Sequence, residues 1–362
     1  MKLSSYAAVA GVASITHANP VTKRAVTDAE VINYALTLEH LEATFYAQGL
    51  QNYSQAEFTS AGFADPFYAN LLKLASDEKA HVQFLTSALE AAGAPATAAC
   101  TYSFPATDVN SFLALANVLE GVGVSAYLGA AASIASKQYL TAAGSILTTE
   151  ARHSSYLRAV LDEVPFAQPF DNPLDFDEIF TVASPFIVSC PSSNPALSVK
   201  AFPSLTVSGN DTIVTGSEVS LVFGKNFAAS GTVSLLTGPV WATVTPSKGG
   251  FSVTVPKGVE GQSFLVLTSS NDKVSDDNII AGPAIVEFGA KNGRLSVDCT
   301  GGNSPTPTSA MASSAPSSSK MAGAGSSNHR EPSALFTGAA GSNAGSPIHI
   351  LGAAAAAAYF LV

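Results

Sequence analysis

One signature occurs twice in the sequence, and this repeat restricts the folds open to the chain more than any other feature. Each copy has a glutamate, a tyrosine seven residues later, and then a Glu-x-x-His motif further along. The two copies, in chain order, are Glu39, Tyr46, Glu78 and His81, and then Glu120, Tyr127, Glu150 and His153. Four helices that each present a carboxylate to a shared centre form a dinuclear metal site in a four-helix bundle.

Apolar periodicity predicts one helix for each of these carboxylates, within a bundle that spans residues 25–190. The expected helix starts are Thr27, Asp65-Pro66 and Thr107-Asp108, and a fourth helix is expected after a short turn at Ser136-Lys137. The first two helices are expected to end at Gly49 and Gly93. A polar loop is expected after Gly49. A shorter fifth helix is expected from Asp175 to just before Pro185. The glutamates and histidines fall inside the apolar stripes, where an unpaired charge is costly.

The spacing within each motif suits metal binding. Residues three apart share a helix face, so the Glu and His of each Glu-x-x-His can reach the same ion. One such motif occurs by chance in many helices, but two copies, each preceded by Glu and Tyr, are a stronger signal. The predicted ligands are Glu39, Glu78, His81, Glu120, Glu150 and His153. The alternative is a metal-free hydrogen-bonded network, which the cost of burying six ionisable groups disfavours.

Three neighbouring residues allow alternatives. Glu42 shares a helix face with Glu39 and Tyr46, so it could replace Glu39 as a ligand or add a further carboxylate. We prefer Glu39 because its offset to Tyr46 repeats the offset of Glu120 to Tyr127. Tyr46 and Tyr127 could hydrogen-bond to the carboxylates or carry a transient radical, and the hydrogen-bonding role is preferred.

Charge and cysteine content narrow the class of protein. The formal charge of -10 argues against nucleic-acid binding, which needs a basic surface. The three cysteines, Cys100, Cys190 and Cys299, form no Cys-x-x-Cys pair. In an oxidising compartment we expect one disulfide and one leftover thiol. We assign the disulfide to Cys100 and Cys190 because both flank the helical region, although spacing alone does not settle the pairing.

Both ends of the sequence resemble targeting signals. Residues 1–18 have the pattern of a secretory signal peptide, and Lys23-Arg24 could end a processed propeptide, residues 19–24, or be an ordinary charged pair. Residues 299–345 are rich in Ser, Gly and Pro and read as a disordered stalk. Residues 346–362 are an uncharged apolar tail, typical of a removed lipid-anchor (GPI) signal, with Asn343 as the assigned attachment residue.

The composition changes after the helical region. From about residue 200 to residue 298, short runs rich in Val, Thr, Ser and Phe alternate with Gly and Asn turns. The expected strands include Glu218–Phe223, Thr232–Leu236, Phe251–Val255 and Ser263–Thr268. This pattern predicts an immunoglobulin-like β-sandwich. Asn52 and Asn210 lie in N-glycosylation sequons.

Residues 27–190 resemble the ferritin-like di-iron carboxylate superfamily, which includes ferritins and rubrerythrins, through the ligand set given above. The secretion signal, β module and anchored tail resemble secreted fungal ferritin-like stress-response proteins, with plant desiccation-related proteins as relatives. The resemblance implies two iron ions, or manganese, and redox chemistry with oxygen or peroxide. The rubredoxin-type cysteine module of rubrerythrins is absent, so the sequence does not indicate an electron donor.

Two functions from different classes are therefore expected. The first is a secreted, cell-surface or cell-wall protein whose dinuclear centre works as a ferroxidase-type oxidase or as a peroxide scavenger, with membrane contact only through the lipid anchor. The second is a non-enzymatic wall or stress-protection scaffold with a metal-free bundle and a partner-binding β module. Metal content discriminates between the two. The sequence leaves the choice of metal, the substrate and the oligomeric state open.

Overall fold

The structure is a computed structural model, and it describes part of the chain. The described residues are 26–208, 213–214, 216–223, 231–236, 241–244, 252–257, 259–270 and 273–289, with backbone alone for 223 and 241–244. The expected signal peptide, propeptide, stalk and lipid-anchor signal lie outside these residues. Asn210, Cys299 and Asn343 also lie outside them.

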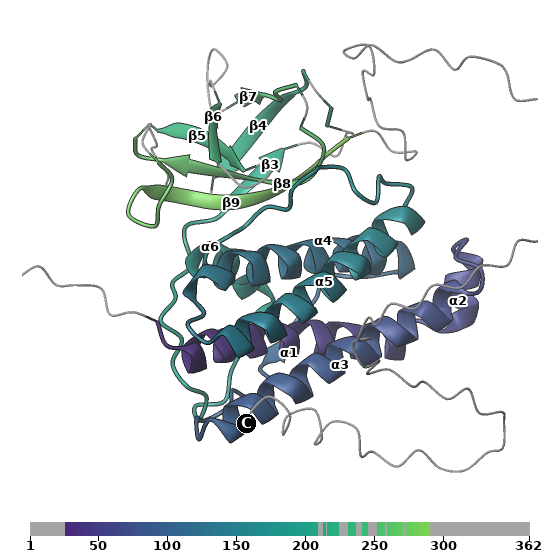
Figure 1. Ribbon diagram of the computed structural model, residues 1–362. Helices are drawn as coiled ribbons and strands as arrows, with labels where there is room; N and C mark the ends of the chain where they lie inside the picture. Colours follow the sequence, from purple (N-terminus) through teal and green to yellow (C-terminus); the bar gives the residue numbers. More distant parts are fainter. Residues whose placement is uncertain are drawn as a thin grey trace, which may run out of the picture. The chain divides into compact units, whose positions relative to one another are not determined.

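Six α-helices precede the larger sheets in the described chain. They are α1 (Asp28–Asn52), α2 (Gln55–Ser60), α3 (Phe67–Ala91), α4 (Val109–Ala130), α5 (Lys137–Val160) and α6 (Phe176–Ala183). Figure 1 shows the four long helices as a bundle in which α1 packs beside α3 and α4 beside α5. The prediction of a bundle of four long helices is confirmed for this part of the chain.

Side-chain caps begin most of the helices where the sequence predicts. Thr27, Asp108 and Asp175 each accept a hydrogen bond from a backbone amide in the first turn of α1, α4 and α6. Ser136, expected in a turn before the fourth helix, caps α5 in the same way. Helix α3 begins one residue later than expected, with Pro66 at the cap position. Asp65 does not cap this helix, because its carboxylate accepts hydrogen bonds from the Gln55 side-chain amide at 3.0 and 3.2 Å.

The expected end of the first helix at Gly49 is wrong. Helix α1 continues to Asn52, and Gly49 is buried within it. A Cβ atom at residue 49 would lie 2.0 Å from Cε2 of Phe112, so the glycine allows the Phe112 ring of α4 to approach α1 closely. Asn52 is therefore exposed at the end of a helix and not in a loop. The expected polar loop contains α2, which buries Phe58 in the core.

Helix α4 has the apolar composition of a core helix. Together with the turn that follows it, Val109–Ser133, it is long and apolar enough to cross a membrane, but 67% of its most apolar window is buried within the protein. Core helices of water-soluble domains pass the same test of length and composition. Glu120, in the middle of this helix, is fully buried among its apolar neighbours, so these neighbours belong to the interior of the bundle.

The described strands are all paired antiparallel, apart from an isolated bridge. A small sheet pairs β1 (Thr101–Tyr102) with β2 (Ile187–Ser189), directly beside the disulfide between Cys100 and Cys190. One larger sheet has the order β3 (Leu205–Ser208), β4 (Glu218–Phe223), β7 (Ser252–Thr254). The other has the order β6 (Trp241–Val244), β5 (Thr232–Leu236), β8 (Gly261–Thr268), β9 (Ile279–Phe288).

The two larger sheets share one hydrophobic cluster, in which Val219 of β4 and Leu265 of β8 are both buried. The prediction of antiparallel strands after about residue 200 is confirmed, whereas the immunoglobulin-like arrangement stays a prediction. The sheet that contains β8 and β9 also contacts the bundle. Phe264 of β8 packs in a cluster with Val122 of α4, and the Gln262 side chain donates a hydrogen bond to the backbone of α4.

Candidate metal centre

Four helices bring the six predicted ligands together in the interior of the bundle. They come from α1 (Glu39), α3 (Glu78 and His81), α4 (Glu120) and α5 (Glu150 and His153). The four glutamates are fully buried, whereas the side chains of His81 and His153 are 12% and 10% exposed. The repeated motif therefore produces one shared centre, as its helix order predicts.

The ligand atoms form two overlapping groups. In the first, Nδ1 of His81 lies 3.2–3.3 Å from carboxylate oxygens of Glu39, Glu78 and Glu150. In the second, Nδ1 of His153 lies 2.9 Å from Oε1 of Glu78 and 3.3 Å from Oε2 of Glu120. Within each group the ligand atoms lie within 4.8 Å of one another, and Glu78 and Glu150 belong to both groups. The arrangement provides two adjacent positions for cations that share two carboxylates.

The tyrosines of the repeated motif bond across the bundle. Tyr46 of α1 donates a 2.6 Å hydrogen bond to Oε1 of Glu120 on α4, and Tyr127 of α4 donates to Oε1 of Glu39 on α1. In each of the two helices the tyrosine lies seven residues after the glutamate. Because α1 and α4 run in opposite directions, the tyrosine of each helix lies opposite the glutamate of the other. Burial, with the charges of the neighbouring carboxylates, raises the pKa of both tyrosines well above the usual value. Both hydroxyls therefore keep the protons that they donate.

Asp77 is a residue at the centre that sequence reasoning missed. Its Oδ2 lies 3.5 Å from Nε2 of His153, on the side of the ring that faces away from the carboxylates. A carboxylate behind a histidine fixes the orientation of the ring and makes the other ring nitrogen a better metal ligand. The only signal in the sequence is that Asp77 directly precedes Glu78, and its pairing with His153 requires the tertiary structure.

Glu42 lies beside the centre but in neither group of ligand atoms. It is buried, and a Cβ atom at Gly123 would lie 2.8 Å from Oε2 of Glu150 and 3.0 Å from Oε1 of Glu42. The glycine of α4 therefore leaves room for both carboxylates. Glu39, rather than Glu42, joins a four-residue group, in line with the preference drawn from the tyrosine spacing.

The charges of the centre offset one another in part. Burial by itself raises the pKa of Glu78, but close contacts with the His153 and His81 rings outweigh burial and lower this pKa to about 2. Burial raises the pKa of Glu39 to about 7 and also raises the pKa of Glu120 and of Glu150, with the negative charge of Glu78 adding to each shift. Without a cation, burial and mutual repulsion therefore favour the protonated form of these three carboxyl groups.

The histidines hold protons as well. Burial opposes protonation of His81, but the carboxylates of Glu150, Glu39 and Glu78 raise its pKa to about 12. Burial also opposes protonation of His153, and Glu120 and Glu78 raise its pKa to about 10. Without a cation both rings are therefore positively charged at neutral pH.

Several polar atoms of the centre lack hydrogen bonds even so. Within the described part of the chain, the buried atoms without a hydrogen-bond partner include Oε2 of Glu39, Oε1 of Glu78, Oε2 of Glu120, both carboxylate oxygens of Glu150 and Nδ1 of His153. An unsatisfied buried polar atom is costly, and more so when it is charged. Carboxylate oxygens and imidazole nitrogens are ligands for iron and manganese. The residues present therefore fit a dinuclear metal centre.

Metal binding is expected to release protons. Metal-bound histidines must be neutral, so ions that bind at pH 7 displace the protons that His81 and His153 carry below about pH 12 and pH 10. We expect release of at least two protons per chain at pH 7, with any protons on the carboxylates adding to the number, and weaker binding as the pH falls. Calorimetric titrations with manganous ion in two buffers of different ionisation enthalpy measure the number released. Identical heats in both buffers would contradict the expectation.

Comparison with known proteins agrees with this geometry. Residues 27–163 match the family of ferritin-like domains. Protein rds1 from Schizosaccharomyces pombe is 30% identical over 179 residues, which are 49% of this chain and 44% of that protein. The chain thus matches less than half the length of this relative. The family match covers all four ligand-bearing helices, from the cap of α1 to just beyond the end of α5.

Proposed function

We propose that the protein, whose residues 27–163 match the family of ferritin-like domains, binds two iron ions at this centre and uses them to reduce dioxygen or hydrogen peroxide. Manganese is the alternative metal. The observation that carries the proposal is the pair of overlapping ligand groups, whose buried carboxylate oxygens include several without a hydrogen-bond partner. A protein that used the bundle only as a scaffold would gain nothing from burying four carboxylates in contact with two histidines.

Two ferrous ions would supply two electrons, so that dioxygen and two protons give hydrogen peroxide, or hydrogen peroxide and two protons give two waters, while two ferric ions form. Glu78 and Glu150 would hold both ions, because they belong to both ligand groups. Tyr46 and Tyr127 orient the carboxylates of Glu120 and Glu39 through their hydrogen bonds. All four carboxylates are fully buried, so the surrounding protein shields them from bulk water.

The proposal is tested by anaerobic titration of the purified protein with ferrous ion, followed by exposure to oxygen. We expect about two ions per chain, oxidation on exposure, and a melting temperature that falls when a chelator removes the metal. The full chain, prepared from a secretory host, is the protein to use. If it takes up neither ferrous nor manganous ion and melts identically with chelator, the scaffold function is the better account.

We also propose that the protein is secreted, N-glycosylated and held at the cell surface by a lipid anchor. The sequence patterns of residues 1–18 and 346–362 and the two sequons support this. The disulfide between Cys100 and Cys190 is a further support, because disulfides persist mainly in oxidising compartments. Exposure of Asn52 at the end of α1 is compatible with glycosylation there.

Phospholipase treatment tests the anchor. Phosphatidylinositol-specific phospholipase is expected to move the protein from the membrane fraction into the supernatant, because the lipid would be its only hold on the membrane. Immunoblots of both fractions measure the shift, and a control protein with a transmembrane helix should stay in the membrane fraction. A membrane-bound chain that still ends in Leu361-Val362 after treatment would contradict the proposal.

For the β module, we propose an immunoglobulin-like sandwich of the two larger sheets. The hydrophobic cluster shared by β4 and β8 supports this arrangement, because sandwiches bury the facing sides of two sheets against each other. In a protein held at the surface by a stalk, such a module would be free to bind partners on its outer faces. This role stands beside the metal chemistry and does not replace it.

A further inference from the structure

We propose that dioxygen, in preference to hydrogen peroxide, reaches the metal centre through an apolar pocket at one end of the bundle. The inference rests on the proposed function and narrows it, because it selects the oxidant. It is carried by the composition of the pocket, by its size, and by its contact with a residue that hydrogen-bonds to a predicted ligand.

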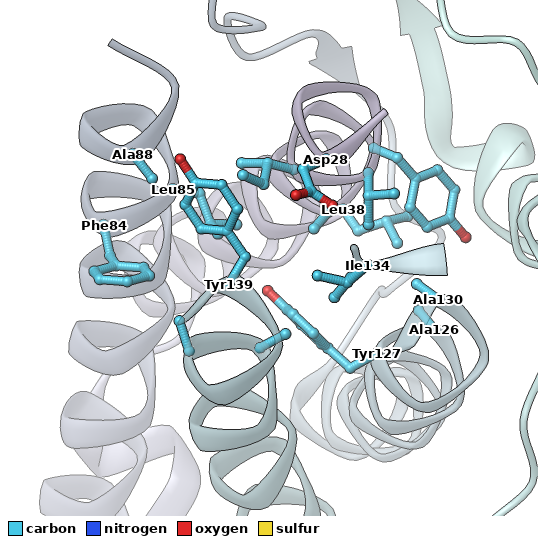
Figure 2. A pocket seen from close by; sticks show the side chains of 16 residues that line it. Asp28, Leu38, Phe84, Leu85, Ala88, Ala126, Tyr127, Ala130, Ile134 and Tyr139 are labelled. Carbon is cyan, nitrogen blue, oxygen red and sulfur yellow. The ribbon is translucent and has the colours of Figure 1, made fainter. Parts of the chain in front are cut away.

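The pocket lies among all four long helices. It has a volume of about 40 Å³, and its accessible surface is almost wholly apolar. Figure 2 shows Phe84 and Leu85 of α3, Leu38 of α1 and Ile134 after α4 around it, with the ring of Tyr127 extending into the space between the helices. The space exists because small side chains line much of the wall, namely Ala35, Ala88, Ala126, Ala130, Ala142 and Ala143.

The pocket reaches the centre at Tyr127. The ring of this residue lines the pocket, and its hydroxyl donates a hydrogen bond to Oε1 of Glu39. Leu38, which also lines the pocket, directly precedes Glu39 in α1. Tyr127 therefore links the pocket to the first ligand group, because its ring lines the one and its hydroxyl bonds to the other.

The chemistry of the lining favours an apolar occupant. Dioxygen forms no strong hydrogen bonds with water, so it loses none on entry, whereas hydrogen peroxide would give up several without replacement. The one carboxylate in the wall, on Asp28, is engaged by the backbone amides of Ala135 and Ser136 at 2.7 and 3.0 Å. The side chains of Asp77 and His153 are 26% and 10% exposed, so we expect polar reactants to approach the centre from this side.

The size of the pocket excludes larger apolar ligands. A cavity needs roughly 10–15 Å³, measured in the same way, to hold one water-sized molecule. The observed volume of about 40 Å³ therefore accommodates a diatomic gas, and an acyl chain would not fit. Xenon is a suitable probe, because apolar protein cavities bind it without polar contacts.

The first experiment measures occupation of the pocket without any redox activity. Full-length metal-free protein is placed under xenon pressure, and the methyl resonances of Ile32, Leu85 and Ile134 are followed by NMR. We expect shifts in wild-type protein and no shifts in Ala143→Leu, which fills the pocket from α5. Ala130→Leu fills it from α4 and serves as a second variant. Ala159→Leu, on the exposed face of α5, is the matched control and should behave as wild type.

The second experiment compares two oxidants on ferrous-loaded protein. In both pocket-filled variants we expect unchanged ferrous stoichiometry, oxidation by dioxygen slowed by about tenfold or more, and oxidation by hydrogen peroxide within about twofold of wild type. Stopped-flow absorbance under single-turnover conditions measures both rates. A slower reaction with dioxygen beside an unchanged reaction with hydrogen peroxide is the decisive result, because damage to the centre itself would slow both reactions.

The outcomes separate this inference from the function on which it rests. Wild-type protein that binds neither iron nor manganese overturns the proposed function and the dioxygen route together. Iron-loaded variants that lose the xenon shifts but react with dioxygen at the wild-type rate overturn only the route. Equal slowing with both oxidants, or absence of xenon shifts in wild-type protein, also overturns the route and leaves the metal chemistry intact.

Discussion

Glu78→Gln is expected to abolish binding of both metal ions. Glu78 belongs to both ligand groups, and its two oxygens face different histidines, with Oε2 3.2 Å from His81 and Oε1 2.9 Å from His153. Glutamine keeps the shape of the side chain but removes its negative charge. Metal content by mass spectrometry should therefore fall from about two ions per chain to near zero.

Thermal melts provide the second measurement for this variant. Metal binding should stabilise wild-type protein by about 3–4 kcal/mol when free metal exceeds its dissociation constant by roughly 100- to 1,000-fold. The Glu78→Gln variant should gain almost none of this. Glu90→Gln, on the exposed face of the same helix, is the matched control and should retain both ions. Glu42→Gln should keep most of the metal, since Glu42 is in neither group. Full metal content in Glu78→Gln would refute the assignment of the centre.

Loss of the disulfide is expected to cause the largest change in folding stability. The bond joins Cys100 to Cys190, which are 90 residues apart, and the enclosed chain contains α4, α5 and α6. Releasing a loop of this length restores a large conformational entropy to the unfolded chain. The double variant Cys100→Ser, Cys190→Ser should therefore lose about 4–5 kcal/mol of unfolding free energy.

Denaturant unfolding without metal, under non-reducing conditions, measures this loss. Wild-type protein treated with a reductant should show a similar loss, because it lacks the same bond. Cys299→Ser is the control, and its unfolding midpoint should match that of wild type. A loss below about 1 kcal/mol in the double variant would mean that the small sheet of β1 and β2 holds the loop closed without the bond.

Most of the candidate site follows from local sequence. The i, i+3 spacing of Glu78 with His81 places both side chains on one helix face whatever the rest of the protein does, and Glu150 with His153 repeats it. Because these four residues lie within the apolar stripes of their helices, they were expected to face the interior of the bundle. Helix caps at Thr27 and Asp108 were also predictable, because a cap depends only on residues within one turn.

Other features depended on how the helices pack, and the local pattern misjudged one of them. Gly49 looks like a helix end, because glycine is a weak helix former, but contact with Phe112 of α4 requires a residue without a side chain there. Gly123 similarly leaves room for Glu42 and Glu150. Neither requirement is visible until two helices are placed side by side.

The sequence by itself determined which residues are available for metal chemistry and which helices carry them, because helix periodicity and capping are short-range. The tertiary structure alone decided which partners those residues meet. The crossed tyrosine bonds, the support of His153 by Asp77 and the apolar pocket beside Tyr127 all depend on the relative register of separate helices. Register is set by packing between distant segments, and no pattern within one helix encodes it.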